Sequence, residues 1–287
     1  MKVIVAEKCG LCAGVKNAIS LAEQVLKKKD CVYSLGPIIH NNDVVNKLAD
    51  MGLHTVEDIN EISNGTVLIR SHGAAPSEIE KVKDEGLKII DATCVLVKRV
   101  QKIAADLERQ GYTVVVMGDA DHPEVKAVVG CVRNAIVVAD ENDLEKLPPD
   151  GRLGVICQTT QSPEYFTRML SAICKRGFSK LKAINTLCKE AVKRQQSAVE
   201  LCKKVDIMFV LGGLDSANTR KLAELCRRHN EQTYHLQNWD EFDKTRLAGK
   251  KTAGVTAGAS TPEWIITEFV ENLEAFEPQQ KSAAARQ

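Results

Sequence analysis

The chain has 287 residues, of which 44% are hydrophobic and only 4% aromatic, enough for one large core or several small aliphatic ones. Because 39 Lys and Arg balance 38 Asp and Glu, the composition favours neither nucleic acid nor an anionic membrane as a partner. No apolar run approaches the roughly 20 residues that span a bilayer, and the N-terminus has no signal-peptide pattern. We expect a cytoplasmic protein whose ten cysteines are free thiols, metal ligands or catalytic groups.

Short runs of Val, Ile and Leu alternate with longer amphipathic segments along the chain. The predicted strands are residues 2–6, 31–35, 65–70, 87–91, 112–118, 135–139, 152–158, 180–185, 205–212, 232–236 and 251–257. Helical periodicity fills most of the intervals, for example residues 15–28, 94–111, 162–177 and 188–205. The alternation predicts an α/β protein with mainly parallel sheets, where ligands bind at the ends of strands and the starts of helices.

A coarse repeat appears when the chain is divided near residues 93 and 187. Each part has a cysteine at the start of a helical segment that follows a strand-like run: Cys12, Cys94 and Cys188. Each part is long enough for two β–α units. The predicted units are residues 1–93, 94–187 and 188–276, followed by a frayed polar tail at 277–287.

The three repeated cysteines suggest one shared site. Cys9 and Cys12 form a C-x-x-C pair, but a thioredoxin-type dithiol would leave Cys94 and Cys188 unexplained, and a zinc ribbon needs a second close Cys or His pair. Three thiolates suit an iron–sulfur cluster with one open iron, or a zinc ion with one open position. The other cysteines lie inside strand or helix patterns and are predicted to be small packed side chains: Cys31, Cys131, Cys157, Cys174, Cys202 and Cys226.

Three histidines, His40, His72 and His122, follow predicted strands and precede helical segments, a position that favours anion binding. Similar turns rich in Gly, Ser, Thr and Asn offer the donors of a diphosphate pocket, although helix capping explains them as well. Neither a P-loop nor an early G-x-G-x-x-G occurs, so nucleotide binding is not expected. Glu124, two residues after His122, is either a proton relay or a first-turn helix charge.

Taken together, the motifs form an ordered series between about residues 2 and 275. They are CAGV, HN, SHG, DATC-x-LV, HPEV, QTT, C-x-x-A-x-x-RQ, S-x-N and VTAGAS-x-P. The series resembles the 4-hydroxy-3-methylbut-2-enyl diphosphate reductase family of the non-mevalonate isoprenoid pathway. Each motif is weak on its own, and their order over nearly the whole chain makes the resemblance specific.

The resemblance implies three α/β units in pseudo-threefold arrangement around a central [4Fe–4S] cluster held by Cys12, Cys94 and Cys188. Two electrons and two protons would remove the substrate's hydroxyl group as water, with ferredoxin or flavodoxin as electron donor. The products would be isopentenyl and dimethylallyl diphosphate. The resemblance assigns the diphosphate to His40, His72, His122, Ser216, Asn218 and Ser260, the hydroxyl region to Thr159, the pocket wall to Thr160 and the proton relay to Glu124.

Several positions depart from the family's pattern. Ala217 replaces a pocket hydroxyl, Glu190 and Ala191 stand where Ala and Thr are expected, and Val95 replaces Pro. Cys9 does not match a family ligand. These departures keep an alternative open, a paralogous iron–sulfur reductase with a different substrate. A non-catalytic iron–sulfur or zinc protein that senses redox state is a further hypothesis.

Overall fold

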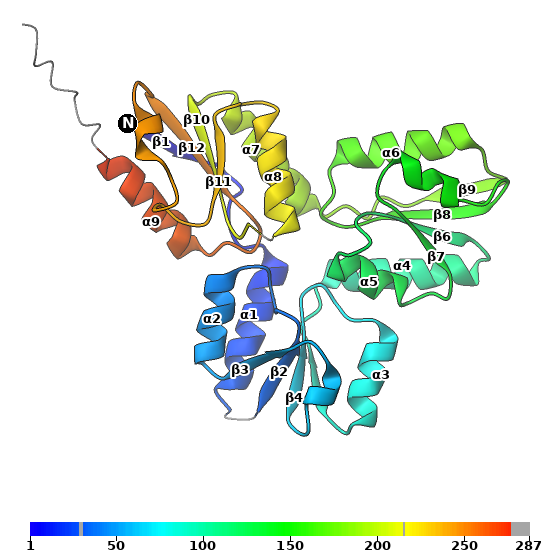
Figure 1. The fold of residues 1–287 in the computed structure, drawn as a ribbon. Helices are drawn as coiled ribbons and strands as arrows, with labels where there is room; N and C mark the ends of the chain where they lie inside the picture. Colours follow the sequence, from blue (N-terminus) through cyan, green and yellow to red (C-terminus); the bar gives the residue numbers. More distant parts are fainter. Residues whose placement is uncertain (29–30, 215, 277–287) are drawn as a thin grey trace, which may run out of the picture. The chain divides into compact units, whose positions relative to one another are not determined.

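The computed structural model describes residues 1–28, 31–214 and 216–276, so the predicted tail at 277–287 lies outside the described residues. Its strands form three parallel sheets of four strands each, which confirms the α/β prediction (Figure 1). The chain divides into two compact units. One comprises Cys12–Val192; the other, here called the terminal unit, comprises Met1–Leu11 and the residues from Lys193 on.

The first sheet of the Cys12–Val192 unit, here the β2 sheet, has the strand order β3-β2-β4-β5. Its elements are α1 (Ala13–Leu26), β2 (Val32–Leu35), α2 (Asn42–Asp50), β3 (Leu53–Val56), η1 (Ile59–Glu61), β4 (Thr66–Ile69), α3 (Pro76–Asp84) and β5 (Lys88–Asp91). One core lies under α1 and α2, and a second lies between the opposite face and α3 (Figure 1). Strand β4 is buried at every position because both of its faces are covered.

The second sheet of this unit, here the β6 sheet, has the order β7-β6-β8-β9. Its elements are α4 (Val95–Arg109), β6 (Thr113–Met117), α5 (Pro123–Val129), β7 (Ala135–Val138), η2 (Glu141–Lys146), β8 (Arg152–Cys157), α6 (Pro163–Arg176) and β9 (Lys180–Ala183). Helices α4 and α5 cover one face, while α6 and η2 cover the other. The carboxyl ends of these strands, which carry the predicted site residues, therefore lie next to the N-termini of helices, as expected for a parallel sheet.

The terminal unit contains the third sheet, in the order β1-β12-β10-β11. Its elements are β1 (Lys2–Val5), α7 (Lys189–Cys202), β10 (Ile207–Leu211), α8 (Ala217–Arg227), β11 (Thr233–Leu236), η3 (Lys244–Leu247), β12 (Thr252–Ala257) and α9 (Glu263–Ala275); α7 begins before the unit boundary. Helices α7 and α8 pack on one face, and α9 packs on the other around the buried Phe209 and Phe269.

Strand pairing differs from the predicted unit over residues 1–93. Strand β1 pairs in parallel with β12 and not with a strand of the β2 sheet. Neighbours in sequence need not be neighbours in a sheet, so the position of β1 does not follow from the strands that come after it in the chain. The boundaries near residues 93 and 187 stay a prediction.

Two further sequence expectations need correction. Strand β3 was not predicted, because only Leu53 of its four residues is buried and the run reads as a loop. Cys31 and Cys174 are exposed and not packed: Cys31 precedes β2, and Cys174 lies on the outer face of α6. The prediction of a packed thiol is confirmed for Cys157, Cys202 and Cys226, while Cys131 is half-buried. None of the described helices is both long and apolar enough to cross a membrane.

Candidate functional site

The three repeated cysteines, Cys12, Cys94 and Cys188, each lie at the start of a helix. All three belong to the Cys12–Val192 unit. Cys12 caps α1, and its sulfur accepts a hydrogen bond from the Val15 N–H at 3.5 Å. The Cys94 N–H donates to the carbonyl of Ser71 at 3.0 Å, just before α4. Cys188 precedes α7, and its side chain, like the other two, is half-buried and free. Helix N-termini favour the thiolate form that metal ligands need.

Gly14 brings two of these sulfurs together. A Cβ atom at this position would lie 2.9 Å from Cys94 Sγ and 3.9 Å from Cys12 Sγ, so both sulfurs face the same small space. Burial raises the pKa of the Cys188 thiol, and the nearby Cys12 and Cys94 add to that rise. The three thiols therefore lie close enough to interact, and Gly14, which lacks a Cβ, allows the Cys94 sulfur to approach α1 closely.

The three predicted anion-binding histidines converge within the same unit. Their ring nitrogens offer ligand atoms that lie within 4.8 Å of one another. The ring centroids of His40 and His72 are 4.7 Å apart, and those of His72 and His122 are 5.6 Å apart. The Ser71 hydroxyl donates to the carbonyl of Ile38 at 3.4 Å, which joins the turns of His40 and His72. The structure therefore brings the three imidazole rings together, while their role as anion ligands stays a prediction.

The charge state of His72 follows from its surroundings. Burial first, and then the neighbouring His40, His122 and Arg70, hold the pKa of His72 well below its usual value of 6.5. Its Nδ1 atom is buried without a hydrogen-bond partner among the described residues. A buried polar atom without a partner costs free energy, so His72 is set up to bond a ligand.

Glu124 and Thr159 form a buried pair beside the histidines. The Thr159 N–H donates to Glu124 Oε1 at 2.7 Å, and the Thr159 hydroxyl donates to Glu124 Oε2 at 2.8 Å. The exposed fractions are 2% for Glu124 and 5% for Thr159, so this pair is shielded from bulk water. His122 caps α5 by accepting the Glu124 N–H at its Nδ1, 3.1 Å away. The Thr159 carbonyl accepts the Cys188 N–H at 2.8 Å, which ties this pair to a candidate ligand.

Thr160 belongs to the same turn and is held by its neighbour. Gln158 donates through Nε2 to the Thr160 hydroxyl at 3.2 Å, and its Oε1 accepts the Asp119 N–H at 3.1 Å. The Thr186 hydroxyl accepts the Cys157 N–H at 2.8 Å, which joins the end of β8 to the segment before Cys188. Sequence reasoning assigned no role to Gly14, Gln158 or Thr186. The signal for Gly14 was present in the CAGV motif, where a glycine stands inside a helical pattern.

The remaining predicted residues lie in the terminal unit. Ser216 caps α8, accepting from the Thr219 N–H at 3.3 Å, and is buried. Ser260 is buried after β12, and Asn218 is half-buried in the first turn of α8. Ser216 and Asn218 thus lie at the start of α8 and Ser260 in the turn between β12 and α9, while their role as ligands stays a prediction. Cys9 packs against the α9 face of the third sheet, and burial raises the pKa of its thiol to about 11.

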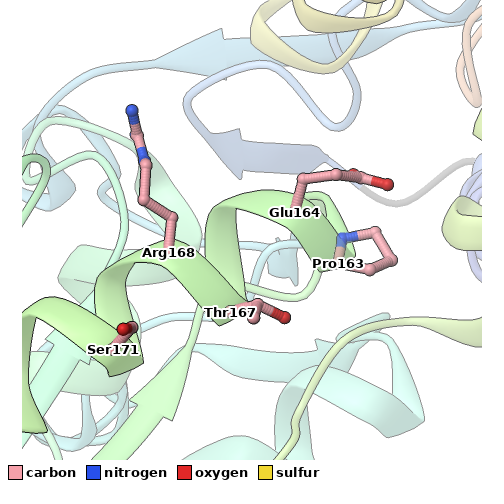
Figure 2. A pocket seen from close by; sticks show the side chains of 5 residues that line it. All are labelled: Pro163, Glu164, Thr167, Arg168 and Ser171. Atoms are coloured by element: carbon pink, nitrogen blue, oxygen red, sulfur yellow. The ribbon is translucent and has the colours of Figure 1, made fainter.

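A separate shallow hollow lies on the outer face of α6. Figure 2 shows the five side chains that line it: Pro163, Glu164, Thr167, Arg168 and Ser171. They include no thiol or imidazole, and none is a predicted site residue. The thiols, histidines and buried Glu124–Thr159 pair therefore remain the candidate site.

The fold and site define an α/β protein with three thiols at helix starts and a cluster of three histidines. A family model described as "LytB protein" matches residues 3–274, and this chain belongs to that family. The chain is 44% identical to 4-hydroxy-3-methylbut-2-enyl diphosphate reductase of Trichlorobacter lovleyi, over 96% of this chain and 98% of the relative. The reductase of Geobacter sulfurreducens is 40% identical, over 98% and 100%.

Two solved structures of such reductases are also similar. One, described as the terminal enzyme of the non-mevalonate pathway, has a TM-score of 0.71 at 40% identity, covering 96% of this chain and 100% of that chain. The other is the Plasmodium falciparum enzyme, with a TM-score of 0.90 at 28% identity, covering 95% and 87%. These relatives support the resemblance drawn from the motifs and give no support to a paralogue with another substrate.

Proposed function

We propose that this protein reduces 4-hydroxy-3-methylbut-2-enyl diphosphate to isopentenyl and dimethylallyl diphosphate. Two electrons and two protons enter, the allylic carbon–oxygen bond breaks, and the hydroxyl group leaves as water. The observation that carries the proposal is the match to reductases of this substrate, at 44% identity over 96% of the chain. The reaction takes place in the cytoplasm, and ferredoxin or flavodoxin supplies the electrons.

A [4Fe–4S] cluster is the cofactor, with Cys12, Cys94 and Cys188 as its protein ligands. The donor set fits, because three thiols lie at helix starts within reach of one another's charge and Gly14 lets the Cys94 sulfur approach that of Cys12. When bound, such a cluster supplies low-potential electrons and one Lewis-acidic iron without a protein ligand. The chain's own contribution is to hold the three sulfurs at helix starts.

His40, His72 and His122 bind the diphosphate, with Ser216, Asn218 and Ser260 as further donors. Support comes from the histidine ligand atoms lying within 4.8 Å of one another and from the unpartnered, buried His72 Nδ1. Neutral imidazole N–H groups give directed hydrogen bonds to phosphate oxygens. Removing one such bond to a charged group costs about 1.5–3 kcal/mol of binding free energy.

Glu124 and Thr159 deliver the proton that the departing hydroxyl group needs. The Thr159 hydroxyl donates to Glu124 Oε2 at 2.8 Å in this structure; for transfer it turns its proton to the substrate oxygen and accepts a proton from protonated Glu124 Oε2. The Thr159 N–H donates to the other Glu124 oxygen, so the carboxyl group is held in one orientation. Thr160 lines the pocket next to this pair.

The experiment is anaerobic turnover of the diphosphate substrate by protein whose iron and sulfide content is measured. Glu124→Gln and Thr159→Val should retain iron and sulfide but lose activity by a factor of about 100 or more. Thr167→Val makes the same change on the exposed face of α6 and should match the unaltered protein. A fully loaded protein that does not consume the substrate would refute the proposed function.

A further inference from the structure

We propose that Gln101 is a positioning residue that holds the His72 turn against the helix carrying Glu124. The inference deepens the proposed function and rests on it. Gln101 lies in α4, seven residues after Cys94, so the two side chains share one side of the helix. Nothing in the sequence around Gln101 marks it as a ligand, and no predicted role was assigned to it.

One amide group of Gln101 bridges two separate segments. Its Nε2 donates to the carbonyl of Ala74 at 3.0 Å and to the carbonyl of Ala127 at 3.2 Å. A glutamine amide has two N–H donors, and this geometry uses both. Gln101 is half-buried, so water competes only in part for these two carbonyls.

The two carbonyls belong to the segments that carry the proposed diphosphate and proton-transfer groups. Ala74 follows His72 by two residues, in the turn between β4 and α3. Ala127 follows Glu124 by three residues, in α5, the helix that His122 caps. In the last turn of a helix the carbonyls lack partners within the helix, and the Ala127 carbonyl accepts from Gln101 Nε2 and, at 3.3 Å, from the Cys131 thiol.

The same two segments also touch directly, with no space to spare. A Cβ atom at Gly130, the C-cap of α5, would lie 2.4 Å from the Cβ of Ala75. A Cβ at Gly73 would lie 3.4 Å from Gln101 Nε2. The distance between the His72 turn and the end of α5 is therefore limited by direct contact. The two hydrogen bonds of Gln101 keep the two segments at this distance.

The consequence is a fixed distance between histidines that come from different sheets. His72 follows β4 of the β2 sheet, whereas His122 follows β6 of the β6 sheet, and their ring centroids are 5.6 Å apart. Both rings must face one diphosphate. Gln101 thus sets the width of the anion pocket without touching the anion.

The test compares variants of the full, cluster-loaded chain. Gln101→Met keeps the length and helix propensity of the side chain but removes both donors. Lys102→Met introduces the same residue at the next, exposed position of α4 and is the control. Gly130→Ala forces the same two segments apart while leaving Gln101 in place, so it tests the idea even if Gln101→Met folds poorly.

Inorganic diphosphate is the probe in calorimetric titration, followed by steady-state turnover. We expect Gln101→Met and Gly130→Ala to raise the Kd for diphosphate and the KM for substrate by about tenfold, with a smaller change in kcat. Thermal unfolding of both variants should remain above the assay temperature, so that a simple loss of fold does not produce the effect.

Two outcomes are separable. If both variants bind diphosphate as tightly as Lys102→Met does, the inference about Gln101 is wrong while the proposed function stands. If the unaltered, loaded protein neither binds diphosphate nor turns over the substrate, the proposed function fails and takes the inference with it.

Discussion

Gly14→Ala is the most direct perturbation of the proposed cluster site. The new Cβ would lie 2.9 Å from Cys94 Sγ and 3.3 Å from Cys94 Cβ, where ordinary contact begins at 3.4 Å. Cys94 Sγ must therefore move by about 0.5 Å or more. Ligands of a metal site tolerate errors of only about 0.5 Å. Changes that disturb ligand orientation typically lower metal affinity by about 10- to 100-fold.

The effect on folding is expected to be much smaller. Alanine is favoured over glycine inside a helix by about 1 kcal/mol. This gain offsets much of the roughly 1–3 kcal/mol that overpacking costs. The apoprotein should therefore remain folded, with a free energy of unfolding lower by about 2 kcal/mol at most. The change acts on cluster retention more than on stability.

The assay is iron and acid-labile sulfide content after anaerobic reconstitution, together with urea unfolding of the apoprotein. Asn17→Ala is the matched control, because it adds an alanine at an exposed position of the same helix, α1. We expect Asn17→Ala to reconstitute fully and Gly14→Ala to lose most of its iron during gel filtration. Equal iron retention in the two variants would refute the idea that this glycine makes room at the cluster.

Three further changes test other parts of the molecule. Phe209→Ala, at the centre of the buried aromatic cluster with Phe242 and Phe269, should cost about 3–5 kcal/mol of unfolding free energy in urea titrations, and an unchanged midpoint would contradict this core. The pKa of His72 lies below that of a histidine in the unfolded chain. Below about pH 6.5 the unfolded chain therefore binds a proton at this residue that the folded chain does not bind. The free energy of unfolding should fall there by at most about 1.4 kcal/mol per pH unit. His72→Gln should flatten this acid-side loss in unfolding measured from about pH 7 to pH 5, and an identical slope would show that His72 titrates normally. Thr159→Ser keeps the hydroxyl that donates to Glu124 and should retain activity within about tenfold, in contrast to Thr159→Val; equal losses would exclude the hydroxyl as the relay.

Much of the fold was predictable because strand runs and helix periods are local signals. The buried run of β4 and the amphipathic pattern of α4 are examples. Strand β3 was missed, since a short edge strand with one buried residue carries almost no pattern. The partner of β1 could not be read either, because pairing with β12 depends on a contact across some 250 positions. The pseudo-threefold arrangement stays a prediction.

The site shows the same division between local and long-range signals. The motifs singled out His40, His72, His122 and Glu124; the structure brings the three imidazoles together, and the Glu124 backbone N–H donates to His122. Gln101 carried no signal, because its two partners are backbone carbonyls and a carbonyl is the same in every sequence. A residue that positions a site by donating hydrogen bonds to backbone carbonyls therefore cannot be recognised from the sequence before the fold is known.

Thr159 links the proposed proton-transfer pair to the proposed thiol site through its hydrogen bonds. Its carbonyl accepts from the Cys188 N–H, while its own N–H and hydroxyl both donate to Glu124. One residue thus fixes the distance between a proposed cluster ligand and the proposed proton donor. Thr159 lies in the short turn after β8, so a shift of that turn would change its hydrogen bonds to both Cys188 and Glu124. A change at Thr159 is therefore expected to affect both the proposed proton-transfer pair and the proposed thiol site.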